Sequence, residues 1–92
     1  MKVVVKGIGD LREYFGREPR ELELPEGARV SDLLQRIGQV WGAGLPRYLW
    51  DFEKSQFRGP VLLVVNKKAV LDLDASLREG TEISIMRAIA GG

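Results

Sequence analysis

The 92-residue chain is long enough for one domain with a single core, and its 45% apolar and 29% charged residues are ordinary for a globular protein. The net charge of +1 provides no strong basic field, so we expect neither nucleic acid nor a membrane as a partner. The sequence contains no cysteine and no histidine, which excludes disulfides, thiolate nucleophiles, Ser–His catalysis and the usual zinc sites, and we expect no metal site.

Residues 1–6 predict a β-strand, with Met1, Val3 and Val5 on one side of an extended chain and Lys2, Val4 and Lys6 on the other. The stretch lacks the long apolar region and the small-residue cleavage site of a signal peptide, so we expect a cytoplasmic protein. Residues 7–10 predict a turn. Residues 11–15 predict either a helical turn or a loop held in place by its aromatic side chains.

A second strand is predicted at residues 20–24, where two leucines alternate with two glutamates. Pro25 and Gly27 follow and are typical of the end of a strand. The simplest pairing for this strand is a hairpin with the first one.

The clearest helix begins near Ser31. We expect the Ser31 hydroxyl to cap the first turn, while Asp32 favours the positive end of the helix dipole. Gly42 is the expected C-terminal stop. Apolar side chains recur at helical spacing and predict one buried stripe, formed by Leu33, Leu34, Ile37, Val40 and Trp41. We interpret this stripe as core packing rather than as a cofactor site.

Residues 42–59 connect the helix to the next strand. The segment is too apolar for a disordered linker, because it contains Tyr48, Leu49, Trp50, Phe52 and Phe57. We expect a short helical turn after Pro46, lying over the edge of the sheet. The segment also interleaves aromatic with basic side chains, a pattern found in proteins that bind single-stranded nucleic acid by stacking on its bases. Packing beneath a long loop explains the aromatic residues without such a partner.

The remaining chain predicts three more strands. Residues 60–66 form the third strand, residues 69–71 a short one, and residues 82–86 a half-buried last strand. The loop before the last strand is expected to place Leu77 in the core. The longest apolar run, within residues 60–66, is far too short to span a membrane.

A single helix can cover only one face of a small sheet. The third strand is apolar on both faces, and Val4 lies on the face opposite its two neighbouring valines. Either residues 42–59 cover the second face, or that face is an apolar patch that meets a partner. The candidate residues for such a patch are Val4, Met86 and one face of residues 61–65.

Beyond Met86 we expect regular structure to stop. The chain ends on Gly91 and Gly92. Glycine has no Cβ, so such an end can enter a narrow channel, and five extended residues reach about 17 Å. The carboxylate of Gly92 is a poor electrophile until an enzyme activates it, and an acyl-adenylate would let a sulfur or nitrogen nucleophile take the acyl group.

The order of these elements, together with the terminal Ala-Gly-Gly, resembles the ubiquitin-like β-grasp sulfur carriers. The resemblance is closest to the MoaD family, the small subunit of molybdopterin synthase. The matching pieces are residues 1–6, 11–13 with Gly16, 30–34, 64–66, 77–80 and 88–92. The resemblance implies an α+β fold. Its β-grasp domain, residues 1–87, packs a small mixed sheet of four to five strands on one main helix, and a flexible Gly-Gly tail follows at residues 88–92.

The resemblance also implies a function and its partners. An E1-like, MoeB-type enzyme would use ATP to adenylate Gly92, and sulfur from a donor would then replace AMP to give a C-terminal thiocarboxylate. The tail would next enter a MoaE-like large subunit of molybdopterin synthase, in molybdenum cofactor biosynthesis. The chain itself would be a carrier rather than an enzyme and would bind no cofactor. The partner-binding tail would comprise Arg87, Ala88, Ile89, Ala90 and Gly91.

Other functions share the same activated glycine and stay open. Related carriers supply sulfur for thiamine (ThiS type), for cysteine (CysO type) or for tRNA thiolation, and ubiquitin-like modifiers join their last glycine to lysines of other proteins. A third class is a plain interaction module with an incidental Gly-Gly end.

Overall fold

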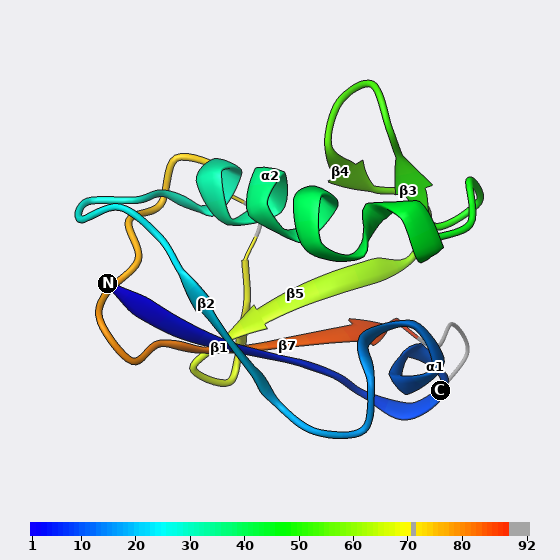
Figure 1. Ribbon diagram of the computed structural model, residues 1–92, viewed down its shortest axis with the longest axis horizontal. Helices are drawn as coiled ribbons and strands as arrows, with labels where there is room; N and C mark the ends of the chain where they lie inside the picture. The colour runs from blue at the N-terminus through cyan, green and yellow to red at the C-terminus, as the bar shows by residue number, and fades with distance from the viewer. Residues whose placement is uncertain (71, 89–92) are drawn as a thin grey trace.

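The computed structural model describes residues 1–70 and 72–88 (Figure 1). Five strands form one mixed sheet in the order β2-β1-β7-β5-β6, and β3 and β4 form a separate two-stranded sheet. This architecture confirms the predicted α+β domain with one main helix. The elements are β1 (Lys2–Gly7), η1 (Gly9–Leu11), α1 (Arg12–Phe15), β2 (Arg20–Glu23), α2 (Val30–Trp41), η2 (Gly42–Gly44), β3 (Trp50–Asp51), β4 (Gln56–Phe57), β5 (Val61–Val65), β6 (Lys68–Ala69) and β7 (Glu82–Arg87).

Strand β1 lies inside the sheet. It pairs with β2 in the predicted antiparallel hairpin, with Val3 opposite Leu22, and it pairs in parallel with β7, with Val5 opposite Ile83. On its other side β7 pairs with β5 in the antiparallel sense, with Leu63 opposite Ile85. The two strands nearest the chain ends therefore both lie inside the sheet, with β7 at its centre.

Helix α2 lies across one face of this sheet (Figure 1). The alternation of the strands directs Val3, Val5, Ile83 and Ile85 toward it, and each of them is buried. Burying one such side chain contributes roughly 1.5–3 kcal/mol. The rest of the core includes the predicted helix stripe, of which Leu33, Leu34 and Ile37 are buried and Val40 and Trp41 half-buried, together with Leu77 from the loop before β7.

The start of α2 differs from the prediction, because Ser31 does not cap it. Arg29 occupies the N-cap position, and Asp32 accepts a hydrogen bond from the Arg29 amide at 2.8 Å. The amides of Val30 and Ser31 have no partner within the helix. They donate instead to the backbone carbonyls of residues 75 and 73, at 3.0 and 2.9 Å respectively. A tertiary contact thus provides the hydrogen bonds to the first-turn amides that the Ser31 hydroxyl was expected to provide.

The end of α2 was predicted at the right place for a different reason. Gly42 stays in the right-handed helical region, with φ of −52°, and the chain tightens into η2 before it becomes extended at Leu45. The predicted helical turn after Pro46 is present, since the amides of Leu49 and Trp50 donate to the Pro46 carbonyl at 3.0 and 3.1 Å. No helix in the described ranges is both long and apolar enough to cross a membrane.

The hairpin β3–β4 was not predicted. It lies on the same side of the sheet as α2 (Figure 1), and edge-to-face aromatic contacts join the two. The ring of Phe57 lies 4.8 Å from that of Trp50 and 6.0 Å from that of Phe15, which in turn lies 5.1 Å from Trp41. The 42–59 segment therefore adds to the core on the helix side and leaves the other face of the sheet to solvent.

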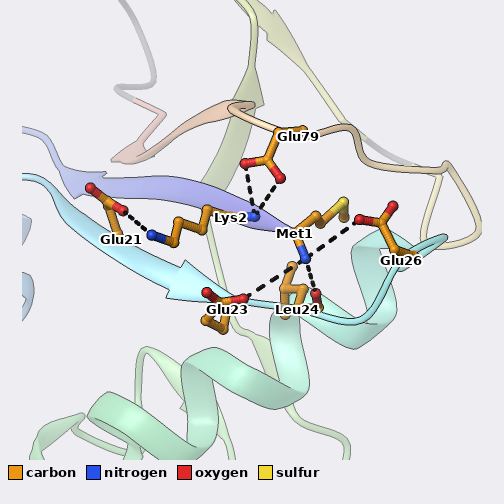
Figure 2. A network of polar contacts seen from close by, with 7 residues as sticks. All are labelled: Met1, Lys2, Glu21, Glu23, Leu24, Glu26 and Glu79. Atoms are coloured by element: carbon orange, nitrogen blue, oxygen red, sulfur yellow. Dashed lines mark hydrogen bonds and ion pairs between the residues drawn. The ribbon is translucent and has the colours of Figure 1, made fainter.

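The loop before β7 is fixed to the start of β1. The Lys2 amide donates to both carboxylate oxygens of Glu79, at 3.1 and 3.2 Å (Figure 2). The Lys2 carbonyl accepts from the Gly80 amide at 2.7 Å. The Met1 amino group donates to the Leu24 carbonyl at 2.7 Å. The Lys2 bonds extend the β1–β7 pairing beyond the strand, and the Met1 bond extends the β1–β2 pairing.

Gly7 lies where η1 folds back over the end of β1, and we expect it to tolerate no side chain. A Cβ on Gly7 would lie 2.9 Å from the carbonyl oxygen of Leu11. Gly7→Ala is therefore expected to lower the free energy of unfolding by about 1–3 kcal/mol, the usual cost of overpacking, as measured by urea denaturation. Gly44→Ala is the control, because nothing lies within 4 Å of its added Cβ. Equal stability of Gly7→Ala and the unmodified protein would contradict this close approach.

Candidate functional site

The sheet has a second face that points away from α2, and we name it the open face. The register places Val4 beside Glu82 on this face and Met86 beside Leu62. The valines and leucine of this face are half-buried, whereas the alternate residues of β5 pack against the core. The open face comprises Lys2, Val4, Lys6, Leu62, Val64, Glu82, Ser84 and Met86.

A shallow groove of about 440 Å³ follows the open face. Val64 and Met86 give it an apolar floor, and Lys6, Lys67 and Glu82 bring charges to it. The remaining lining residues are Ile8, Asn66 and Ser84. An apolar strip with charges around it is the usual form of a protein docking surface. Residues 42–59 do not cover this face, so the first alternative was wrong, and a partner patch that includes Val4 and Met86 stays a prediction.

The root of the tail is more ordered than expected. Strand β7 continues to Arg87, which pairs with Val61, and the amide of Ala88 donates to the Pro60 carbonyl at 2.6 Å. The expectation that regular structure stops after Met86 was wrong by one residue, because β5 begins early enough to pair with Arg87. Ala88 is exposed. The other predicted tail residues, Ile89, Ala90, Gly91 and Gly92, lie outside the described residues, as does the predicted flexibility of the tail.

Arg87 joins a group of side chains that we name the Arg87 cluster: Asp10, Tyr14, Tyr48 and Arg87. The Arg87 Nε donates to Asp10 Oδ2 at 2.7 Å, and its guanidinium lies 6.0 Å from the centre of the Tyr48 ring. The hydroxyls of Tyr14 and Tyr48 lie 3.1 Å apart and share a hydrogen bond. The cluster thus connects η1, α1 and the 42–59 segment to the last residue of β7.

The hydrogen bonds of the cluster change two proton affinities. The bond to Tyr48 raises the pKa of Tyr14 from its ordinary 10.0 to about 12. The bond from Arg87 to Asp10 raises the pKa of the Arg87 guanidinium further above its ordinary value. The Tyr14 hydroxyl and the Arg87 guanidinium therefore keep their protons throughout the physiological range.

The sequence missed Asp10, Tyr14 and Tyr48 as neighbours of the tail. Asp10 was part of an expected turn and Tyr14 part of an ambiguous segment, and 77 positions separate Asp10 from Arg87. No signal in the sequence separates Tyr48 from the aromatic residues near it, because its 62% exposure is a property of the folded chain. In residues 1–70 and 72–88 no group of three or more Asp and Glu side chains converges as a metal site would require.

Residues 5–92 match the model of the ThiS family. The chain belongs to the ThiS family. Members of this family are small ubiquitin-like sulfur carriers, so the predicted class of carrier is confirmed at this level. No curated protein matches the chain by sequence.

Solved structures agree with this assignment of a ThiS-family fold. SAMP1 from Haloferax volcanii is similar with a TM-score of 0.79, at 20% identity over 100% of both chains. A putative molybdopterin converting factor, subunit 1, from Pyrococcus furiosus has a TM-score of 0.71 at 27% identity, over 96% of this chain and 98% of its own. A chain of the Amycolatopsis orientalis BexX/CysO complex has a TM-score of 0.65 at 27% identity, over 98% and 99%. The ubiquitin-like β-grasp fold is thereby confirmed.

Proposed function

We propose that this chain carries sulfur on the carboxyl group of Gly92 as the small subunit of molybdopterin synthase. The carboxylate attacks the α-phosphorus of ATP and releases pyrophosphate, and a sulfur donor then displaces AMP to leave the thiocarboxylate. The observation that carries this proposal is the family match, which continues through Gly91 and Gly92 to the last residue. The chain supplies an acyl group to these steps, and its partners supply the catalytic residues.

Two partners follow from this chemistry. A MoeB-type adenylating enzyme binds ATP and charges Gly92, and a MoaE-like large subunit receives the charged tail. The open face offers both partners the same apolar strip for docking, at the end of which β7 leads into the tail. The five residues after Arg87 reach about 17 Å when extended, which is enough for Gly92 to enter a site that the docked body itself does not reach.

The choice of molybdopterin rests on the similar Pyrococcus furiosus protein, which is named a putative molybdopterin converting factor, subunit 1. The Amycolatopsis orientalis chain is as similar in sequence and comes from a BexX/CysO complex. A carrier for another sulfur pathway is therefore the second candidate function, and a modifier of the SAMP1 kind is the third. All three use the same adenylated glycine.

The proposal is tested with the full chain, ATP, a sulfur donor and a MoeB-type enzyme. Loading replaces one oxygen by sulfur and raises the intact mass by about 16 Da. The loaded chain, mixed with a MoaE-like subunit and the molybdopterin precursor, is expected to lose this added mass as molybdopterin forms. Loading without molybdopterin would redirect the assignment to another sulfur pathway. Isopeptide-linked species from host extract would redirect it to protein modification.

Met86 lies at the end of the open face that is nearest the tail, and we expect it to contribute to partner docking. Met86→Glu places a charge in the apolar strip of the proposed interface, beside the start of the tail, and is expected to weaken binding of the MoaE-like subunit more than about tenfold. Isothermal titration calorimetry measures this affinity. Leu73→Glu is the matched control, because Leu73 is 39% exposed in a loop away from the open face. Equal affinities of the two variants would exclude the open face as the docking surface.

A further inference from the structure

The Arg87 cluster lies where the chain leaves the domain, and four separate segments meet there. Asp10 comes from η1, Tyr14 from α1, Tyr48 from the turn after Pro46, and Arg87 from the end of β7. The side chain of Arg87 is 31% exposed and that of Asp10 is 60% exposed. An arginine at this distance from a carboxylate and over an aromatic ring is held in one direction by two different kinds of contact.

Backbone contacts at the same place act together with the cluster. Arg87 pairs with Val61 in the sheet, and the Ala88 amide donates to the Pro60 carbonyl at 2.6 Å. Hydrogen bonds therefore hold the main chain up to Ala88, and the ion pair with Asp10 holds the side chain of Arg87 against η1. Without the cluster, the last pair of a strand would open readily, as strand ends generally do.

We propose that Asp10 and Tyr48 position Arg87 so that the tail leaves the domain from one fixed point. Arg87 is then a positioning residue of the carrier rather than part of the tail that enters a partner. The inference rests on the proposed function for its consequence in sulfur loading, and on the geometry of the described residues for the cluster itself. The exposed ion pair keeps β7 closed at its last residue, so only the chain beyond this point is available to reach an active site.

Trypsin tests the cluster independently of sulfur chemistry, because it cleaves after arginine and needs the arginine side chain in its own specificity pocket. In the molecules in which Arg87 is bound to Asp10, its side chain is unavailable to trypsin. Asp10→Ala is expected to speed cleavage between Arg87 and Ala88 about two- to fivefold, the range that an exposed ion pair supports. Tyr48→Ala is expected to act in the same direction. Mass spectrometry at early times measures the loss of the last five residues.

Glu13→Ala is the matched control for this experiment. It removes another exposed carboxylate, one position before Tyr14 and outside the contacts of Arg87. The control is expected to be cleaved at the rate of the unmodified protein, and melting temperatures are compared for all variants. Cleavage of Asp10→Ala at that same rate would overturn the proposal.

Loading kinetics test the consequence for function. Arg87→Glu is expected to lower kcat for loading by the MoeB-type enzyme about tenfold with KM within about twofold, because the open face still docks while the tail departs from a variable point. Adding Asp10→Arg reverses the ion pair and is expected to restore at least half of kcat. A double variant no better than Arg87→Glu alone would overturn the positioning role, since Arg87 would then contact the enzyme directly. If the unmodified chain is not loaded at all, the proposed function fails while the trypsin result still decides whether the cluster holds Arg87.

Discussion

A chain shortened by one residue, with Gly92 deleted, is expected to fold as the full chain does and to accept no sulfur. The deletion leaves Gly91 as the last residue, so a carboxylate is still present but lies about 3.5 Å short of its former reach. Adenylation requires the reacting atoms to lie within roughly 3–3.5 Å of each other. The shift is thus as large as the whole tolerance of the reaction. Intact mass spectrometry after incubation with ATP, sulfur donor and a MoeB-type enzyme measures the loss.

Two companion variants make this result specific. Adding one alanine after Gly92 keeps every native residue and moves the carboxylate by the same distance in the other direction, and it is expected to block loading equally. Ala88→Gly alters the tail without changing its length and is expected to be loaded. The melting temperatures of all variants are expected to agree, because terminal residues contribute little to stability. Full loading of either length variant would contradict an essential role of Gly92.

The sequence predicted the elements whose apolar residues recur at the spacing of a strand or of a helix. Strand β2 and helix α2 each present one apolar face, and the positions of these faces follow from alternation or from helical spacing. The open face followed from the same rule, because Val4 and Met86 must point away from the neighbours that enter the core. For these elements local pattern and tertiary burial agree, which is why the prediction held.

The parts that escaped prediction depend on contacts between distant residues. The N-cap of α2 was misplaced because carbonyls of residues 73–75 satisfy the first amides, a contact that no local pattern indicates. Hairpin β3–β4 has only two residues in each strand, too few to show alternation. Its turn is stabilised by Asp51, whose carboxylate accepts from the amides of Lys54 and Glu53 at 3.0 Å, and these bonds lower the pKa of Asp51. The ion pair of Asp10 with Arg87 likewise requires the complete sheet.

Trp50 links the unpredicted hairpin to the main helix, and its loss is expected to be the most destabilising single change among those considered. Its side chain is 2% exposed and packs against Phe57 and Gly38. Trp50→Ala is expected to lower the free energy of unfolding by about 3–5 kcal/mol, as large-to-small changes at buried aromatic residues do. For a domain of this size the melting temperature falls by about 4–8 °C per kcal/mol. Thermal and urea denaturation both measure the effect.

Phe52→Ala is the matched control, because Phe52 belongs to the same hairpin but is 50% exposed. It is expected to change the free energy of unfolding by less than about 0.5 kcal/mol. Comparable losses in Trp50→Ala and Phe52→Ala would mean that the hairpin unfolds as a unit without support from the core, and would contradict the packing of Trp50 on α2.

The contact with Gly38 gives this prediction a second consequence. Glycine inside a helix costs about 1 kcal/mol relative to alanine, yet a Cβ on Gly38 would lie only 3.1 Å from Cζ2 of Trp50. In the Trp50→Ala protein that ring is absent, so adding Gly38→Ala is expected to recover about 1 kcal/mol of stability. In the unmodified protein the same change is expected to gain less, because the ring must move aside. The effects of the two changes on the free energy of unfolding are therefore expected to be non-additive, as they usually are for residues in contact. Additive effects would contradict the close packing of the Trp50 ring on Gly38.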